Sequence, residues 1–500
     1  MDALVSNLAL GFSVALSLQN LGLAFVGCLV GTLIGVLPGI GPIATITMLL
    51  PITFNVEPTG ALIMLAGIYY GAQYGGSTTA ILVNIPGEVT SVVTVLDGHQ
   101  MARQGRAGAA LGIAAIGSFF AGCVATLVIA ALAVPLTRLA LVFGPFEYFS
   151  LMTAGLAFAV VLARGSVPKA ILMVLVGLLM GTVGTDLDTG AERMTFGVQS
   201  LSDGVDFAVL AMGLFGFAEV LRNLEAVEHR DLVKRSIGSV LPTWADLKQS
   251  AAAVVRGTFV GSILGILPGN GAVLGPFASY TIEKKLAKDP SRFGRGAIEG
   301  VAGPESANNA GAQTSFIPLL ALGIPPNAVM ALMVGAMTIH GIVPGPLVMS
   351  KSPRLFWGIV ASMWIGNLML LIINLPLVRV WVKFLEVPYR LMFPAILLFS
   401  AIGIYTVNSS PSDVLFAAAF AVVGWALSKL EFETAPLLLG FVLGRLMEEN
   451  LRRGLAIARG DVLAFLTRPI SGVLLAVAVV VLAVAILPSV RKGRQEVFTE

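Results

Sequence analysis

Long apolar stretches recur along the whole chain and are separated by short polar segments. A helix that crosses the hydrocarbon core of a bilayer needs about 20 mostly apolar residues. Measured against that length, the sequence predicts membrane-spanning helices at residues 21–37, 60–71, 107–134, 146–163, 171–183, 207–221, 257–267, 328–339, 356–377, 391–407, 414–427 and 470–487. Segments such as 60–71 and 257–267 are too short to cross a bilayer alone, so we expect broken or re-entrant helices among roughly ten to twelve spans.

Composition indicates the same class of protein. Apolar residues make up 56% of the 500-residue chain and charged residues only 12%, about half of the ~25% found in soluble domains. So few charges cannot cover the surface of a soluble protein of this length. The sequence therefore predicts an all-α polytopic membrane protein in contact with the lipid bilayer. A net charge of +3, without a basic stripe carrying aromatic residues, predicts no nucleic-acid partner.

The distribution of lysine and arginine predicts which loops face the cytoplasm, since cytoplasmic loops carry an excess of these residues. Residues 222–256, 284–295 and 491–494 are basic and are expected inside the cell. The segment 184–206 carries five acidic residues and one arginine, and it is expected outside. The first residues lack the Lys or Arg that opens a signal peptide, so we expect no cleaved leader.

Several short motifs occur twice, in the same order in each half of the chain. GVLPGIG at 35–41 returns as GILPGNG at 265–271. The further pairs are GAQ at 71–73 and 311–313, NIP at 84–86 with GIP at 323–325, and, more loosely, GIAAIGS at 112–118 with GIVASMWIG at 358–366. These pairs predict a duplicated bundle with a first half at 1–221, a charged cytoplasmic linker at 222–256 and a second half at 257–500.

The two halves are expected to be inverted relative to each other in the membrane. Residues 54–59, after the first Pro-Gly motif, carry Glu57 and no basic residue, whereas the corresponding residues 284–295 are strongly basic. Opposite charge bias predicts opposite sides of the membrane. A parallel arrangement stays open, because residues 103–106 and 351–354 are both basic.

The repeated Pro-Gly motif, at 38–41 and 268–271, predicts a turn between two helices at membrane depth, because proline removes a backbone donor and glycine accepts left-handed angles. The free N–H groups and the dipole of the second helix then attract an anion. The residues expected to contact a carboxylate substrate here are Pro38, Gly39, Gly41, Pro268, Gly269, Asn270 and Gly271. The alternative is a kink that serves only helix packing.

Hydroxyl and amide side chains gather between apolar segments at corresponding places in the two halves, in GGSTTA and ESANNAGAQTS. Such uncharged groups provide oxygen ligands for a hard cation and donors for a carboxylate. The candidates for substrate binding are Ser77, Thr78, Thr79, Ser306, Asn309, Gln313 and Thr314, and those for Na⁺ are Asn84 and Asn308. Hydrogen bonding that merely joins helices is the alternative role.

The sequence has no phosphate-binding GxxxxGK loop, no HExxH and no GxSxG motif. We therefore expect no catalytic residue and no cofactor, with transport driven by an ion gradient or by a partner. The ionisable residues near apolar runs are expected at loop margins and interfaces, without a proton relay; they are Glu88, Asp97, Glu219, His340, Glu431 and Glu433. A membrane-embedded enzyme using Asp97 and His99, or His340, and a structural scaffold remain alternatives.

At these motifs the sequence resembles the large permease subunit of the bacterial tripartite tricarboxylate transporters. The matching stretches are GVLPGIGP (35–42), YGGSTTAILVNIPGE (74–88), LDGHQMARQGRAGAALGIAAIGSF (96–119), GILPGNG (265–271), ESANNA (305–310), IPLLALGIP (317–325) and IHGIVPGP (339–346). They are long and specific, and the resemblance covers nearly the whole chain.

The resemblance implies a sodium-coupled permease in the bacterial inner membrane that imports an organic di- or tricarboxylate. Its partners would be a small membrane subunit and a periplasmic solute-binding protein. A stand-alone carboxylate symporter is the alternative within transport. Many relatives continue after ESANNA with small residues, whereas this chain has Gln313 and Thr314 there. Tartrate, other hydroxy acids and aromatic carboxylates therefore stay open as substrates beside citrate.

Overall fold

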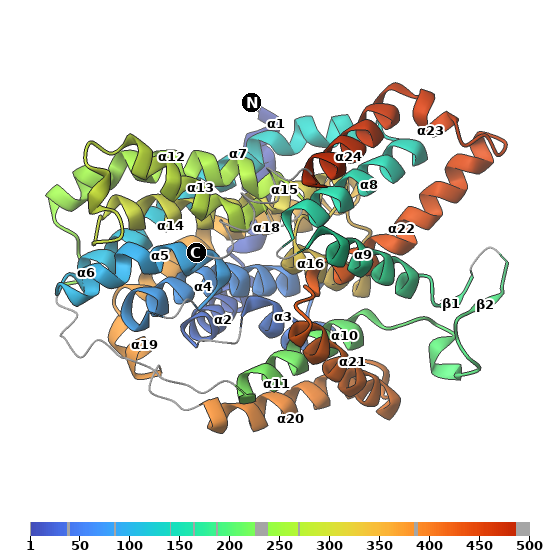
Figure 1. Ribbon diagram of the computed structural model, residues 1–500, viewed down its shortest axis with the longest axis horizontal. Coiled ribbons are helices and arrows are strands. Elements are labelled where there is room, and N and C mark those ends of the chain that lie inside the picture. Colours follow the sequence, from blue (N-terminus) through green and yellow to red (C-terminus); the bar gives the residue numbers. More distant parts are fainter. Residues whose placement is uncertain are drawn as a thin grey trace.

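The computed structural model describes residues 2–37, 41–84, 87–140, 142–163, 166–186, 189–225, 239–268, 271–384 and 389–486. Helices account for nearly all regular structure in these segments (Figure 1). The α-helices are α1 (Asp2–Ala15), α2 (Leu18–Val36), α3 (Pro42–Thr53), α4 (Pro58–Val83), α5 (Val92–Thr94), α6 (Gln100–Arg103), α7 (Ala107–Ala140), α8 (Pro145–Leu162), α9 (Val167–Gly181), α10 (Phe207–Ala211), α11 (Ala218–Glu225), α12 (Trp244–Ile266), α13 (Gly271–Leu286), α14 (Glu299–Thr314), α15 (Phe316–Leu322), α16 (Ala328–Ile339), α17 (Leu347–Lys351), α18 (Pro353–Asn374), α19 (Val378–Phe384), α20 (Tyr389–Asn408), α21 (Pro411–Lys429), α22 (Ala435–Ile457), α23 (Ala464–Thr467) and α24 (Pro469–Ile486). Single turns of 3-10 or π-helix lie at Val89–Ser91, Val95–His99, Gln199–Leu201, Met212–Phe217 and Pro290–Arg292.

One small hairpin is the only strand structure in the described residues. β1 (Gly184–Thr185) pairs antiparallel with β2 (Glu192–Arg193), with Gly184 opposite Arg193. The hairpin lies at the edge of the molecule, away from the central helices (Figure 1). Because each strand has only two residues, the hairpin does not change the fold class, and the predicted all-α fold is confirmed.

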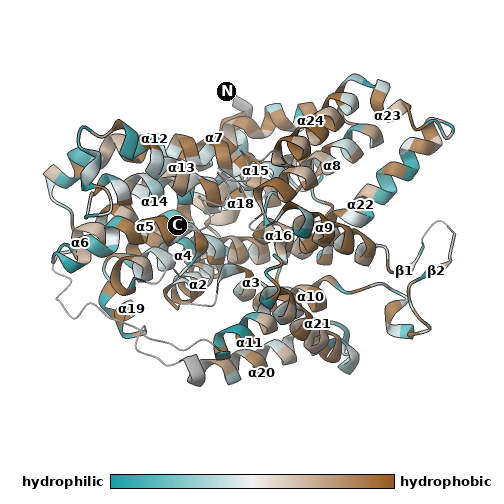
Figure 2. Cartoon of the chain, in the orientation of Figure 1, coloured by the Kyte–Doolittle hydropathy of each residue, from teal (hydrophilic) through white to brown (hydrophobic). Residues whose placement is uncertain are grey.

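Among the described residues, seven helical segments are long and apolar enough to cross a membrane, which agrees with the predicted polytopic membrane protein. They are Leu18–Val36, Ala107–Leu139, Pro145–Leu162, Phe207–Glu225, Trp244–Ile266, Pro353–Asn374 and Pro411–Lys429. The shorter apolar helices are Leu4–Ala15, Pro42–Thr53, Val167–Gly181, Ala328–Ile339 and Pro469–Ala485. Figure 2 shows hydrophobic residues over almost all of α24, whereas the outer part of α22 is hydrophilic.

Two helices, α4 and α12, extend far beyond their predicted spans. α4 covers Pro58–Val83, although the apolar pattern predicts only 60–71, because its Gly, Ser and Thr residues continue the helix inside the protein. α12 begins at Trp244, within the segment predicted to be a charged linker. Thr243 and Asp246 cap this helix through reciprocal side-chain to backbone hydrogen bonds, which stabilise its start. The charge-rich stretch is therefore partly helical.

α4 and α14 lie inside the bundle along their whole length. Residues 59–83 of α4 and 300–314 of α14 are all buried. α14 carries a glutamate, two asparagines and a glutamine in these positions. Polar groups at membrane depth are costly unless they face other protein groups or a cavity. The burial of these two polar helices therefore directs attention to the groups they contact.

The tightest helix pairs, α2 with α4 and α12 with α14, are built alike. In each pair three glycines, four residues apart, lie directly against backbone carbonyl groups of the partner helix, because the absence of a side chain lets two backbones approach closely. On α2 they are Gly27, Gly31 and Gly35 against Met64, Ile68 and Ala72; on α12 they are Gly257, Gly261 and Gly265 against Gly303, Ala307 and Gly311. Each glycine of α2 and its counterpart on α12 are 230 residues apart in the sequence. Each carbonyl group of α4 and its counterpart on α14 are 239 residues apart.

The helix breaks predicted at the Pro-Gly motifs are confirmed by the flanking helices. α2 ends at Val36 and α3 begins at Pro42, while α12 ends at Ile266 and α13 begins at Gly271. The Ile-Pro motifs show a further likeness. Asn84 after α4 and Gly323 after α15 both have left-handed backbone angles, with φ of 62° and 74°, and 239 residues separate them.

Candidate functional site

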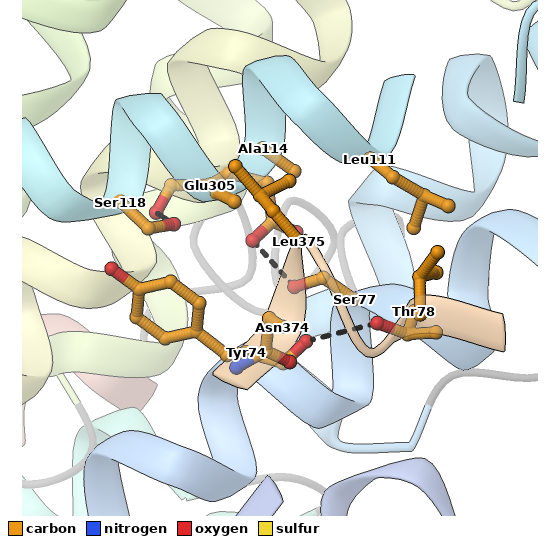
Figure 3. A pocket seen from close by; sticks show the side chains of 11 residues that line it. Tyr74, Ser77, Thr78, Leu111, Ala114, Ser118, Glu305, Asn374 and Leu375 are labelled. Carbon is orange, nitrogen blue, oxygen red and sulfur yellow. Dashed lines mark hydrogen bonds between the residues drawn. The ribbon is translucent and has the colours of Figure 1, made fainter. Parts of the chain in front are cut away.

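A small cavity with polar and apolar lining residues lies where α4, α7, α14, α18 and α19 meet (Figure 3). Its lining residues are Tyr74, Ser77, Thr78, Leu111, Ala114, Ala115, Ser118, Glu305, Asn374, Leu375 and Val378. The cavity has a volume of about 20 Å³. A site for one water molecule needs roughly 10–15 Å³ on this measure. The cavity therefore suits a water-sized particle or a bare cation, and it is too small for a carboxylate substrate.

Glu305 is the one acidic residue that lines this cavity. Its side chain is buried, with 1% of the residue exposed. The Ser77 hydroxyl donates to Oε2 at 2.5 Å, and the Thr94 hydroxyl donates to Oε1. Figure 3 shows the Ser77 side chain of α4 directed at the Glu305 carboxylate of α14. Two hydroxyl donors from the first half of the chain thus fix a carboxylate from the second half.

The carboxylate of Glu305 has no basic partner in the described part of the chain. None of the ion pairs formed there includes it. A buried ionised carboxylate is costly unless a charge of opposite sign compensates it. Hydroxyl donors reduce this cost but do not neutralise the charge. The cavity therefore contains an uncompensated acidic group.

Two further oxygen atoms at the cavity have no hydrogen-bond partner among the described residues. The Tyr74 hydroxyl and Asn374 Oδ1 are both buried and unsatisfied. The Asn374 amide nitrogen, in contrast, donates to the Leu370 carbonyl at 2.8 Å and to Thr32 Oγ1 at 3.4 Å. Buried polar atoms are rarely left without a partner in native proteins. Their presence beside Glu305 indicates a site that binds a small polar particle.

The structure brings four of the predicted polar residues to this site. Ser77 and Thr78 line the cavity, and the Thr78 hydroxyl also donates to the Tyr74 carbonyl of its own helix. Asn309 Nδ2 donates to Ser118 Oγ at 2.7 Å and to the Glu305 carbonyl at 3.1 Å, so it lies just behind the lining. Ser306 is fully buried against Gly117 of α7, and its hydroxyl has no partner among the described residues.

The remaining predicted polar residues lie elsewhere on the same helices. Thr79 and Thr314 donate to carbonyl groups of their own helices, at Gly76 and Ala310. Gln313 accepts from Thr126 of α7 at 2.6 Å. These bonds satisfy each side chain within the bundle, which is the helix-joining role of polar groups.

The two residues predicted to bind Na⁺ occupy different environments. Asn84 is exposed and ends α4 with a left-handed backbone. Asn308 is 1% exposed, and neither of its amide atoms has a partner among the described residues. Neither residue lines the cavity at Glu305.

Part of each Pro-Gly turn lies outside the described residues. Pro38, Gly39, Gly269 and Asn270 belong to that part. Gly41 precedes α3, and its carbonyl accepts from the Thr45 amide and hydroxyl. Pro268 packs near Gly155 of α8, and Gly271 begins α13 in tight contact with the Leu264 carbonyl.

Of the other ionisable residues considered from sequence, Glu219 pairs with Arg222 and Glu431 with Lys169. Glu88 Oε1 and His340 Nε2 are instead buried atoms without a hydrogen-bond partner among the described residues. Asp97 is completely buried, although a loop margin was predicted for it. Its Oδ1 accepts from the amides of Gly294, Gly296 and Ala297 at 2.8–2.9 Å, and its Oδ2 accepts from Tyr280 at 3.0 Å. His340 ends α16, as predicted. Asp97 therefore fastens the loop before α14 to the π-helical turn at Val95–His99.

Glu305 does not appear among the ionisable residues that the sequence pattern singles out, although it opens the ESANNA motif. It lies in a stretch of small and polar residues, which is not apolar enough to be predicted as a membrane-spanning helix. One signal could have found it. Between residues 300 and 350, Glu305 is the only Asp, Glu, Lys or Arg. A single acidic residue in so long an uncharged stretch is a functional candidate in a membrane protein.

Comparison with known proteins identifies the family. Residues 21–439 match the tripartite tricarboxylate transporter TctA family. The chain is 58% identical over 497 residues to an uncharacterized 52.8 kDa protein in the TAR-I ttuC' 3'region of Agrobacterium vitis, with 99% of each chain covered. It is also 58% identical over 240 residues to an uncharacterized protein in the TAR-II ttuC' 3'region of the same organism, which covers 48% of this chain and 99% of the relative.

No solved structure matches the chain. The family is one of transporters, so the alternative of a membrane-embedded enzyme is rejected, and the partner subunits of a tripartite transporter are implied. The family match spans α4, α7, α14, α18 and α19, and thus every helix that lines the cavity. The chain belongs to the tripartite tricarboxylate transporter TctA family, as the multi-pass permease subunit of such a transporter.

Proposed function

We propose that this permease imports an organic di- or tricarboxylate across the bacterial inner membrane, coupled to Na⁺ and supplied by a periplasmic solute-binding protein. A small membrane subunit completes the transporter. The observation that carries the proposal is the uncompensated Glu305 carboxylate beside a cation-sized cavity, where helices of the two halves meet. Such a group suits a transporter driven by a cation gradient, because a buried carboxylate gains its counter-charge when the cation binds.

The carboxylate substrate is proposed to bind at the helix starts that follow the two Pro-Gly motifs. α3 begins after Gly41 and α13 begins at Gly271, and each start leaves backbone N–H groups without partners inside its helix. Together with the helix dipole, these groups favour an anion.

The chain is proposed to consist of two repeats, inverted in the membrane, that move against the remaining helices during transport. The matching glycine contacts of α2–α4 and α12–α14 support a duplicated unit. In this mechanism the cavity at Glu305 opens to one side of the membrane and then to the other. Cross-links that join the paired units to the surrounding helices should stop transport, and full transport in such cross-linked protein would contradict the moving-unit mechanism.

The proposed function is tested by uptake of labelled carboxylates into vesicles containing the permease. The panel includes citrate, tartrate and an aromatic carboxylate, each with and without a Na⁺ gradient, the small membrane subunit and the loaded binding protein. We expect uptake of one carboxylate class that needs both the gradient and the binding protein. Gradient-driven uptake without the binding protein would establish the stand-alone symporter instead. No uptake of any carboxylate would overturn the proposal.

A further inference from the structure

We propose that the cavity at Glu305 is the binding site of the coupling Na⁺, held by the Glu305 carboxylate, the hydroxyls of Tyr74 and Ser77, and Asn374 Oδ1. This assignment rests on the proposed Na⁺ coupling and gives it a location. It differs from the sequence-based candidates Asn84 and Asn308, neither of which lines the cavity.

The first argument is charge. Glu305 is buried, accepts hydroxyl donors only from Ser77 and Thr94, and belongs to none of the ion pairs of the described residues. A bound cation would supply the missing positive charge at the place where the cavity meets the carboxylate. Without it, the ionised group would keep its full desolvation cost.

The second argument is the set of oxygen atoms around the cavity. Hard cations prefer carboxylate, carbonyl and hydroxyl oxygen ligands. Tyr74 and Asn374 line the cavity, and the Tyr74 hydroxyl and Asn374 Oδ1 are buried without hydrogen-bond partners among the described residues. The Ser77 hydroxyl uses its proton toward Glu305, and its lone pairs remain free for a cation. Together these residues offer one charged and three neutral oxygen donors.

The third argument is the charge of the ligand set, which favours a monovalent cation. Only one carboxylate lines the cavity, whereas sites for Ca²⁺ or Mg²⁺ usually collect several negative groups or phosphate. In the described residues no group of three His, Cys, Asp or Glu side chains could hold a transition metal. The volume of about 20 Å³ admits one dehydrated ion and leaves no room for a hydrated one.

The position of the site explains how the cation would affect the substrate. Ser77 and Tyr74 belong to α4, Glu305 to α14 and Asn374 to α18, so one ion would join three helices from both halves of the chain. Binding of Na⁺ then favours the arrangement in which these helices are packed together. A ligand shifts a conformational equilibrium only through such a difference in affinity between two states.

The test measures binding of radioactive Na⁺ to the purified full-length permease in detergent, with K⁺ replacing Na⁺ as the balancing salt. The variant Glu305→Gln keeps the size of the side chain and an oxygen acceptor for Ser77, but it removes the charge. We expect saturable binding to the wild type and a loss of about tenfold or more in affinity in the variant. The matched control is Glu431→Gln, whose side chain is 90% exposed at the end of α21.

The assay needs no carboxylate, so it separates this inference from the proposed function. Equal Na⁺ affinity of Glu305→Gln and wild type, or no Na⁺ binding by the wild type, would overturn the site assignment even if carboxylate uptake is demonstrated. Loss of binding in Glu305→Gln alone would support the site even if every carboxylate tested fails to be transported. If Glu305→Gln does not fold, Ser77→Ala decides: we expect an affinity weaker by about tenfold, and an unchanged affinity would overturn the assignment.

Discussion

The hydroxyl of Ser77 on α4 lies 2.5 Å from Oε2 of Glu305 on α14 and donates to it across 228 residues of sequence. This contact joins the two buried polar helices of the bundle. It is also the point where a neutral motif of the first half, GGSTTA, meets the acidic motif of the second half, ESANNA. The predicted repeat is therefore not symmetric in its chemistry, because the carboxylate comes from one half and its donors from the other.

Replacing Ser77 with alanine should weaken the site without disrupting the fold. A hydrogen bond to a charged group contributes about 1.5–3 kcal/mol, so the Na⁺ concentration for half-maximal uptake should rise by about tenfold. The measurement is a Na⁺ titration of carboxylate uptake. The control is Ser362→Ala, because Ser362 is equally buried on α18 and donates only to the Ile359 carbonyl of its own helix. An equal effect of both substitutions would contradict a specific role of Ser77.

A valine at Gly261 should separate α12 from α14. A β-carbon at this position would lie 2.1 Å from the Ala307 carbonyl oxygen, and both groups belong to tightly packed backbones. Overpacking of this kind costs roughly 1–3 kcal/mol or more, so we expect a lower thermal unfolding temperature and less folded protein in detergent.

Gly22→Ala is the matched control for that substitution. Gly22 lies on the exposed side of α2, and nothing lies within 4 Å of the position of its β-carbon. Alanine there should leave stability unchanged or raise it by about 0.5–1 kcal/mol through helix propensity. Comparable destabilisation by both substitutions would show that the close approach at Gly261 is not what holds these helices together.

Asp97 should matter for folding and not for Na⁺ coupling. Alanine at this position leaves the buried amide of Ala297 and the partly buried amide of Gly296 without their acceptor, at a cost of about 1–3 kcal/mol for a buried unsatisfied group. We expect a clear fall in thermal stability, with unchanged Na⁺ dependence in the protein that still folds. Asp203→Ala, at an exposed position, should change neither property. A selective loss of Na⁺ dependence in Asp97→Ala would contradict the structural role.

The hairpin β1–β2 should be held to α22 by Asp186. This carboxylate pairs with Arg452 at 2.5 Å and with Arg193 at 3.4 Å, and its side chain is only 5% exposed. Arg193 also pairs with Glu448 of α22 at 2.6 Å, so Asp186→Ala should loosen the hairpin without releasing it and should accelerate cleavage by trypsin at Arg193. Because the segment 184–206 is predicted outside, cleavage is expected when trypsin is added to spheroplasts. Cleavage confined to inside-out vesicles would reverse the predicted sidedness.

The parts of the fold that sequence predicts well are those set by local chemistry. The helix breaks before α3 and α13 follow from proline and glycine, whose backbone effects do not depend on distant residues. The apolar pattern also predicts the helix Ala328–Ile339 with the bounds that the structure shows. Local residues set these bounds, because Asn327 caps the start of the helix and Gly341 follows its end. The number of membrane spans and the inversion of the repeats remain predictions.

The parts that sequence could not supply depend on tertiary contacts. The C-terminal half of α4 is helical because α2 and α14 surround it, and no apolar pattern records that burial. Ser77 and Thr78 could be selected as polar residues within a repeated motif. Glu305 and Asn374 could not be joined to them, because three helices distant in sequence must first pack before the cavity exists.

The most direct test of the account is carboxylate accumulation by the complete three-component transporter, with wild-type permease and with Glu305→Gln, in the presence and absence of an inward Na⁺ gradient. The account predicts that wild type accumulates the carboxylate only with the gradient, and that Glu305→Gln, folded and assembled with its partners, does not accumulate it under either condition. Accumulation by Glu305→Gln with the same Na⁺ dependence as wild type would contradict it.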